Sequence, residues 1–342
     1  MASDAAKMMS GNTSASSRTE TTQLENKPSL GMRRRMRALG RDLWFKVFLL
    51  LEKFGVHVMP KNFYTPIQDY HWLKTNKDLW MGRCALSGID WNVQQQLEWM
   101  QDICRPFHHE VQGVEFHAES AARGWGPGFG AVETEVLHCF VRSKAPARIV
   151  EIGSGQSTVC MLHASELNAK EGRAPSQITC IEPYPRRALQ DLQGVILMKQ
   201  PCQSVPGGVF AQLRAGDLLF IDSSHAVKVG SDVIRIYLEI IPKLPAGVFV
   251  HIHDINLPYL YNRSTLSPFF MQNSQETALL VALLTGNDHL RVLASLSALH
   301  YDRQPELKAL FADYDPEENI EGLFSSYPRK GHAPNSIWLQ TR

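Results

Sequence analysis

Residues 148–158 read RIVEIGSGQST, and this stretch decides the fold. A short apolar run ends in two glycines, and a helix is expected over residues 157–168 immediately afterwards. Gly153 and Gly155 allow a tight turn and a close approach of the backbone to a ligand. The first turn of the following helix offers free N–H groups and the positive end of its dipole. The stretch therefore predicts a strand, a ligand-binding loop and a helix in succession.

The same alternation continues on the C-terminal side of this stretch. Nearly continuous apolar runs alternate with helical stretches, as is typical of a parallel sheet covered on both faces. We expect strands at residues 148–152, 178–182, 194–198, 217–222 and 247–252, with two more at 290–296 and 336–340. We expect the intervening helices at residues 157–168, 185–192, 206–213 and 229–243. The predicted fold class is α/β and Rossmann-like, with a seven-stranded, mostly parallel sheet.

Three features of the sequence indicate that the ligand of the glycine loop is not a dinucleotide. Glu151 lies two residues before the first glycine, where its charge disfavours a pyrophosphate but suits a ligand with ammonium and sulfonium groups. Thr158 stands where a dinucleotide motif has its third glycine. Glu182 ends the second strand 29 residues after Gly153, a longer spacing than dinucleotide enzymes use, and it is placed to accept two ribose hydroxyls.

Both acidic residues also have purely structural interpretations. Glu151 could lie in a solvated turn, and Glu182 could cap a helix ahead of Pro183. We favour ligand roles, because an open α/β sheet binds its ligand at the carboxyl ends of its strands.

The ends of two later strands carry several polar and ionisable residues. The fourth strand ends at Asp222 and continues to His225, and the fifth contains His251 and His253 and is followed by Asp254. His251 and His253 share one face, since side chains alternate along a strand. Both segments end at the same edge of the sheet, beside the glycine loop, so we expect the reacting groups there.

The chemistry at this edge has more than one interpretation. His225 is a candidate general base for a hydroxyl acceptor. Asp222, His253 and Asp254 are candidate ligands of a divalent metal that activates the acceptor. A hydrogen-bonded network without metal is the alternative. We interpret His251 as a core histidine, and we take His225, Asp222, His253 and Asp254 as the catalytic candidates.

The chain divides into three parts in this interpretation: a disordered tail at 1–30, a helical and aromatic extension at 31–130, and the catalytic domain at 131–342. The tail is polar and poor in apolar residues. Residues 33–54 fit an amphipathic helix rich in arginine, which predicts contact with its own domain or a partner subunit, or peripheral attachment to a membrane. The aromatic segment 258–270, with Tyr259, Tyr261 and Arg263, is a candidate lid.

Composition bears on the class of protein and on its partners. The net charge of +1 gives no support to a nucleic-acid partner. The six cysteines form no CxxC pair, so zinc-site spacing is absent and a reducing compartment is indicated. The sequence contains no apolar run of membrane-spanning length. We therefore expect a cytoplasmic location.

Several segments together resemble the class I S-adenosylmethionine (SAM)-dependent methyltransferases, in a bacterial branch similar to small-molecule O-methyltransferases. These are FGVHVMPKNFYTPIQD (54–69), RIVEIGSGQST (148–158), CIEPYP (180–185), GDLLFIDSSHAVKVGSDV (216–233), LPAGVFVHIHDINLP (244–258) and SIWLQ (336–340). The resemblance implies a sheet whose last strand is antiparallel.

The resemblance also implies roles for single residues. Glu151, Gly153 and Gly155 would line the methionine part of SAM, Glu182 its ribose, and residues 202–204 its adenine. In metal-dependent relatives the fourth-strand aspartate and an Asp-Asn pair hold Mg²⁺, where this chain reads Asp222 and His253-Asp254. The complete predicted cofactor set is Glu151, Gly153, Ser154, Gly155, Ser157, Thr158, Glu182, Pro183, Cys202, Gln203 and Asp222.

The function predicted from all of this is methyl transfer from SAM to an oxygen of a small-molecule or glycan acceptor, with Mg²⁺ or another divalent metal as a candidate cofactor. A non-catalytic protein that binds SAM or a partner is the first alternative. A nicotinamide-dependent oxidoreductase is the second, and Glu151, Thr158 and the spacing to Glu182 count against it.

Overall fold

The structure is a computed structural model that describes residues 30–65, 67–126, 128–261, 266, 274–312, 314, 316 and 334–342. The predicted disordered tail and Arg263 of the predicted lid lie outside these residues. The described chain falls into two compact units, one up to Thr65 and one from Ile67 onward. The segment between Ile67 and Gly130, which we expected in an N-terminal extension, thus belongs to the second unit.

The described part of the first unit contains one helix, α1 (Leu30–Glu52), followed by an irregular segment. The predicted helix at 33–54 is therefore present. No helix among the described residues combines the length and the apolar character needed to cross a membrane.

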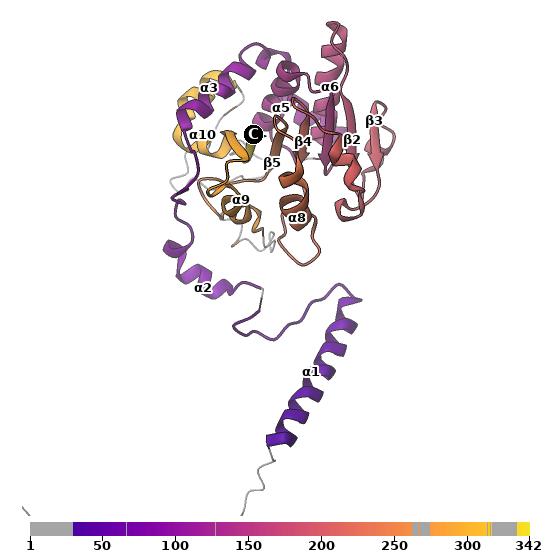
Figure 1. The fold of residues 1–342 in the computed structure, drawn as a ribbon, viewed down its shortest axis with the longest axis vertical. Helices are drawn as coiled ribbons and strands as arrows, with labels where there is room; N and C mark the ends of the chain where they lie inside the picture. The colour runs from indigo at the N-terminus through magenta and orange to yellow at the C-terminus, as the bar shows by residue number, and fades with distance from the viewer. Residues whose placement is uncertain are drawn as a thin grey trace, which may run out of the picture. The chain divides into compact units, whose positions relative to one another are not determined.

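The second unit is built on a seven-stranded sheet in the order β3-β2-β1-β4-β5-β7-β6 (Figure 1). Strands β1 to β5 are parallel to one another, and β7 is antiparallel to both β5 and β6. The expected fold class and the antiparallel last strand are both confirmed. The strands are β1 (Arg148–Ile152), β2 (Gln177–Ile181), β3 (Val195–Met198), β4 (Leu218–Ile221), β5 (Phe249–His253), β6 (Leu290–Ser295) and β7 (Ser336–Thr341).

Two hydrophobic clusters cover the two faces of the sheet. In β4, Leu218 and Phe220 belong to one cluster, while Leu219 and Ile221 belong to the other, as the two-residue period of a strand requires. The first cluster includes side chains of α3 (Val93–Cys104), α5 (Ala131–Lys144), α6 (Gln156–Lys170), α10 (Leu296–Asp302) and α11 (Gln304–Leu310). The second includes side chains of α8 (Asp232–Arg235) and α9 (Glu276–Leu284). Both faces are therefore buried, which explains the apolar character of the strands.

Several helices between the strands are shorter or less regular than the sequence pattern predicts. The stretch predicted at 185–192 contains only α7 (Arg187–Gln190), and the one at 206–213 is a 3-10 helix (Gly207–Gln212). The long helix predicted at 229–243 is α8 followed by a π-helical turn (Ile236–Ile240) and a 3-10 turn (Ile241–Lys243). Pro242 has no backbone N–H to continue α-helical bonding, which accounts for the final 3-10 turn.

Shorter helices complete the second unit before β1. They are α2 (Tyr70–Thr75), a 3-10 turn (Lys77–Leu79), a second 3-10 turn (His108–Glu110) and α4 (Gly113–Ala122), with one more 3-10 turn (Cys202–Ser204) after β3. The start of α3 is capped by Asn92, whose side-chain oxygen accepts the N–H of Gln95.

Candidate active site

The glycine loop after β1 is held tightly against the end of β4. Gly153 has φ +90°, and a Cβ at this position would lie closer than 3.0 Å to the backbone carbonyl oxygen of Asp222. The Gly153 N–H donates to the Ile181 carbonyl (3.0 Å), and the Asp222 N–H donates to the Ile152 carbonyl (2.8 Å). The predicted cofactor loop and the predicted catalytic aspartate are thus in direct contact.

Glu151 is fully buried and faces the first turn of α6. Its two carboxylate oxygens accept hydrogen bonds from the hydroxyls of Ser157 and Thr158, both at 2.6 Å. Burial raises the pKa of this carboxyl group to about 7, against the opposing effect of these hydrogen bonds. The Gly155 N–H in turn donates to the Thr158 hydroxyl at 3.1 Å. The side chains of Glu151, Ser157 and Thr158 therefore bind one another and, through Thr158, fix the backbone of the glycine loop.

The loop keeps one hydroxyl available for a ligand. The Oγ atom of Ser154 is buried and has no hydrogen-bond partner among the residues that the structure describes. A buried polar atom without a partner costs free energy, so a ligand that satisfies it gains affinity. Ser154, together with the N–H groups at the start of α6, offers hydrogen-bond donors to a carboxylate.

Glu182 and Pro183 follow β2 at the same edge of the sheet and are half-buried. The Glu182 N–H donates to the Met198 carbonyl (3.0 Å), and one carboxylate oxygen accepts the Tyr184 N–H (2.7 Å). These bonds fix the backbone and the side chain of Glu182 at the strand end, where we expect the ribose.

Cys202 and Gln203 lie after β3 and are held by Arg235 of α8 and by Gly230, which precedes that helix. The guanidinium of Arg235 donates to the carbonyls of Cys202 (2.5 Å) and Val205 (2.6 Å), while the Gln203 side-chain amide donates to the Gly230 carbonyl (3.0 Å). Burial raises the pKa of the Cys202 thiol to about 12, so the thiol stays protonated and unreactive. Cys202 therefore shapes this wall through its backbone and volume.

His225 lies at the centre of the polar cluster after β4, surrounded by three carboxylates. Its Nε2 atom is 3.3 Å from Asp222 Oδ1 and 3.4 Å from Asp254 Oδ2, and its Nδ1 atom is 2.6 Å from Glu276 Oε2. Burial works against the charged imidazole, but the hydrogen bonds to Asp222 and Glu276 and the charge of Asp254 raise the pKa of His225 well above its usual value. Ligand atoms of Asp222, His225 and Asp254 all lie within 4.8 Å of one another, which makes them a candidate metal-binding group.

Backbone strain coincides with this cluster. His225 has φ +55° and Asp254 has φ +56°, a left-handed conformation that side chains other than glycine adopt rarely and at a cost in energy. Such strain persists only where the surrounding contacts fix it. Asn335 provides one of these contacts, since its side-chain amide donates to Asp254 Oδ1 at 2.8 Å.

The two histidines of β5 lie outside the cluster of ligand atoms. His251 is buried between Phe220 and Trp338, with ring centroids 4.4 and 4.5 Å away, and burial lowers its pKa well below the usual value. This agrees with its interpretation as a core histidine. His253 is also buried, with its ring 4.9 Å from that of Phe129 and its Nε2 atom 3.7 Å from Asp254 Oδ1. Hence His225, rather than His253, faces both aspartates.

Two residues of this site, Glu276 and Asn335, are not among those predicted from the sequence. Glu276 is the first residue of α9, has a fully buried side chain, and is 51 positions from His225. Asn335 immediately precedes β7, which pairs with β5. Only the placement of β7 beside β5 could have suggested that Asn335 lies next to Asp254. The resemblance implied that the last strand is antiparallel but not which strand it pairs with.

The predicted lid is partly described. The Cys84 N–H donates to the Pro258 carbonyl (2.7 Å), the Arg83 guanidinium donates to the Tyr259 hydroxyl (3.3 Å), and the ring centroids of Trp80 and Tyr261 are 6.3 Å apart. The segment around Arg83 therefore holds the start of the loop that follows Asp254.

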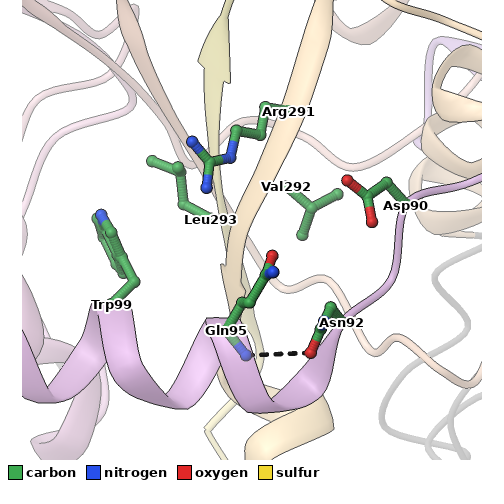
Figure 2. A pocket seen from close by; sticks show the side chains of 7 residues that line it. All are labelled: Asp90, Asn92, Gln95, Trp99, Arg291, Val292 and Leu293. Atoms are coloured by element: carbon green, nitrogen blue, oxygen red, sulfur yellow. Dashed lines mark hydrogen bonds between the residues drawn. The ribbon is translucent and has the colours of Figure 1, made fainter.

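Two hollows on the second unit contain none of the predicted site residues. A small one of about 20 Å³ lies between α3 and β6 and is lined by Asp90, Asn92, Gln95, Trp99, Arg291, Val292 and Leu293 (Figure 2). A second, of about 170 Å³, is lined by Gly88, Ile89, Asp90, Leu284, Gly286, Asn287, Asp288, Leu290, Val292 and Arg342. The first has room for about one water molecule. The predicted cofactor-binding and catalytic residues lie instead at the carboxyl edge of β1, β2, β4 and β5.

One region of the chain is similar to a known enzyme domain. Residues 150–255 match the sequence model of a methyltransferase domain. The chain is also 26% identical over 171 residues to an uncharacterized protein of Archaeoglobus fulgidus, a match that covers 45% of this chain and 73% of that protein. The domain match includes the glycine loop, Asp222, His225 and Asp254, whereas Glu276 and Asn335 lie outside it.

The chain also matches solved structures, at low sequence identity and low TM-score. A methyltransferase of Podospora anserina, bound to S-adenosylhomocysteine, is 14% identical, and the match covers 70% of this chain and 93% of that chain with a TM-score of 0.35. A SAM-dependent methyltransferase of Archaeoglobus fulgidus is 15% identical, with coverages of 61% and 94% and a TM-score of 0.32. An O-methyltransferase family 2 protein of Planctomyces limnophilus, in complex with apigenin, is 14% identical, with coverages of 67% and 61% and a TM-score of 0.28. No inference about the acceptor follows from likenesses of this size.

Proposed function

We propose that this chain, a SAM-dependent methyltransferase, transfers the methyl group to an oxygen atom of a small-molecule or glycan acceptor at the edge formed by Asp222, His225 and Asp254. The observation that carries this proposal is the contact between Gly153 and Asp222, which brings the cofactor loop against the polar cluster. Methyl transfer is an in-line displacement, so the two binding sites must adjoin.

The cofactor assignment rests on the chemistry available at β1 and β2. The buried hydroxyl of Ser154 and the N–H groups at the start of α6 suit the carboxylate of the methionine moiety. Glu182 is fixed at the strand end, where it suits the ribose hydroxyls. We infer that Glu151, Ser157 and Thr158 act through the loop, because their side chains bind one another.

We propose further that Asp222, His225 and Asp254 hold a divalent metal. The donor set of two carboxylates and one imidazole fits Mn²⁺, Fe²⁺ or Zn²⁺, and also Mg²⁺ if the carboxylates dominate. The buried carboxylate of Glu276 binds His225 Nδ1, which leaves Nε2 directed at the two aspartates. Metal-binding histidines are oriented by carboxylates in this way. This proposal puts His225 in the position that the sequence analysis gave to His253.

The reaction needs removal of the acceptor's proton as its oxygen bonds to the methyl carbon and the carbon–sulfur bond of SAM breaks. A metal at the three side chains would lower the pKa of a hydroxyl bound to it. His225 as a general base is the alternative. Its two ring nitrogens both face carboxylates at 3.4 Å or less, so neither points away from the cluster toward an acceptor, and this geometry favours the ligand role.

Calorimetric titration with MnCl₂ tests the metal proposal. We expect one binding event in the wild type and a loss of affinity of at least tenfold in Asp254→Asn. Glu276→Gln should weaken binding about 10- to 100-fold, the usual effect of removing the partner of a metal-binding histidine. His253→Gln is the matched control and should bind Mn²⁺ as the wild type does.

Two results would contradict the metal proposal. Wild-type protein that binds no Mn²⁺ would leave His225 as a base or as part of a hydrogen-bonded network. Loss of binding in His253→Gln with retention in a His225→Gln variant would return the site to the set predicted from the sequence.

A further inference from the structure

Exposed apolar side chains are concentrated in the first unit of the chain. Thirteen of the twenty large hydrophobic residues that are exposed in the described structure lie between Leu39 and Tyr64. They are Leu39, Leu43, Trp44, Phe45, Val47, Leu49, Leu50, Phe54, Val56, Val58, Met59, Phe63 and Tyr64. Scattered apolar residues on a surface need no explanation, but a contiguous group of this size marks an interaction surface.

The charge of the chain is also distributed unevenly. Residues 30–54 contain seven Lys and Arg residues and two acidic residues, a net charge of +5, while the whole chain has +1. The remaining residues therefore contain 28 Lys and Arg residues against 32 acidic ones. Such asymmetry between parts of a chain favours contact with an anionic surface.

Charge and apolar character are separated along α1. Arginines occupy its N-terminal half, where Arg34, Arg35 and Arg41 are exposed. Within the C-terminal half, the stretch from Leu43 to Leu51 contains one charged residue, Lys46, and Glu52 ends the helix. The nine residues of this stretch span about 13 Å as a helix, roughly half the thickness of a bilayer core, so the stretch is too short to cross a membrane but long enough to enter one leaflet.

The apolar half of α1 is apolar around most of its circumference. At 100° per residue, Leu43, Val47 and Leu50 share one side, while Phe45 and Leu49 lie on the opposite side. All five are exposed. A single partner helix covers one stripe of such a helix and would leave the other side in water. A lipid phase surrounds the inserted end, which suits this arrangement better than a second copy of the chain does.

We propose that residues 30–64 bind the surface of membranes that contain anionic lipid. The arginines of α1 lie among the headgroups, and Leu43–Leu51 enters the acyl region of one leaflet. Lys46 reaches back to the headgroups along its aliphatic stem. The aromatic residues Phe63 and Tyr64, further along the chain, lie at the interface between lipid and water. The proposal does not depend on the reaction that the second unit catalyses.

Co-sedimentation of the full chain with vesicles tests this proposal. Vesicles of phosphatidylcholine with about a third of phosphatidylglycerol should bind the wild type at least tenfold more tightly than pure phosphatidylcholine vesicles. A charge variant, Arg34→Glu/Arg35→Glu/Arg41→Glu, and an apolar variant, Phe45→Glu/Leu49→Glu, should each lose this binding. The matched control is Val229→Glu/Leu238→Glu, which changes two exposed residues of the second unit and should bind like the wild type.

The thermal unfolding of every variant should match that of the wild type, because the substituted side chains are exposed. Failure of the wild type to prefer anionic vesicles would overturn the proposal. Sedimentation velocity distinguishes the main competitor: a wild-type dimer that Phe45→Glu/Leu49→Glu converts to a monomer, without binding to vesicles, would assign this surface to a second copy of the chain.

Discussion

Replacing Gly153 by alanine should destabilise the second unit far more than the same change two residues later. Gly153 has φ +90°, and an added Cβ would approach the Asp222 carbonyl oxygen to less than 3.0 Å. A left-handed backbone costs an alanine about 1–2 kcal/mol, and overpacking against a fixed backbone costs about 1–3 kcal/mol more. The expected loss in the free energy of unfolding is therefore about 2–5 kcal/mol.

Gly155→Ala is the matched control for this prediction. Gly155 has φ 174°, which any residue adopts, and its added Cβ would lie 3.3 Å from the Trp125 carbonyl oxygen. We expect a change of less than about 1 kcal/mol, because alanine also reduces the entropy of the unfolded chain. Urea denaturation of both variants measures the difference. Equal stabilities would refute the inferred contact between the glycine loop and the end of β4.

Three further predictions concern charged groups. His138 is buried with its pKa lowered to about 4, so the free energy of unfolding of the wild type should fall by up to about 3 kcal/mol as the pH drops from about 6.5 to about 4. Urea denaturation at several pH values should show a smaller fall in His138→Gln, and an unchanged slope would contradict a buried, neutral His138. Glu182→Ala should abolish SAM binding in calorimetry, whereas Asp191→Ala, at an exposed position after the same strand, should not; wild-type affinity in the first would remove the ribose assignment. Asp222→Ala should eliminate turnover of any acceptor found by screening with radiolabelled SAM, and an active variant would shift catalysis to other residues.

The sheet could be predicted from the sequence because both of its faces are buried. Strands such as Leu218–Ile221 are continuously apolar, and the glycine loop after Ile152 marks the end of the first strand. The helix expected over 229–243 was less predictable. Its apolar periodicity is real, but Pro242 and the π-helical turn at Ile236–Ile240 interrupt the α-helix.

The site residues at the strand ends could be predicted from the sequence, but the residues that bind them could not. Asp222 and Asp254 follow neighbouring strands, so topology alone brings them together. Glu276 belongs to a separate helix, and its contact with His225 depends on tertiary packing that no local pattern encodes. The contact of Glu151 with α6, by contrast, could have been predicted. Ile149 belongs to the hydrophobic cluster that includes α5 and α6, and the two-residue period of a strand places Glu151 on the same face as Ile149.

Calorimetric titration of the purified chain with SAM, S-adenosylhomocysteine and NAD tests the central claim most directly. We predict micromolar binding of SAM and S-adenosylhomocysteine, no binding of NAD, and loss of the SAM signal in Glu182→Ala. Binding of NAD without SAM would contradict the assignment of the glycine loop and, with it, the proposed reaction.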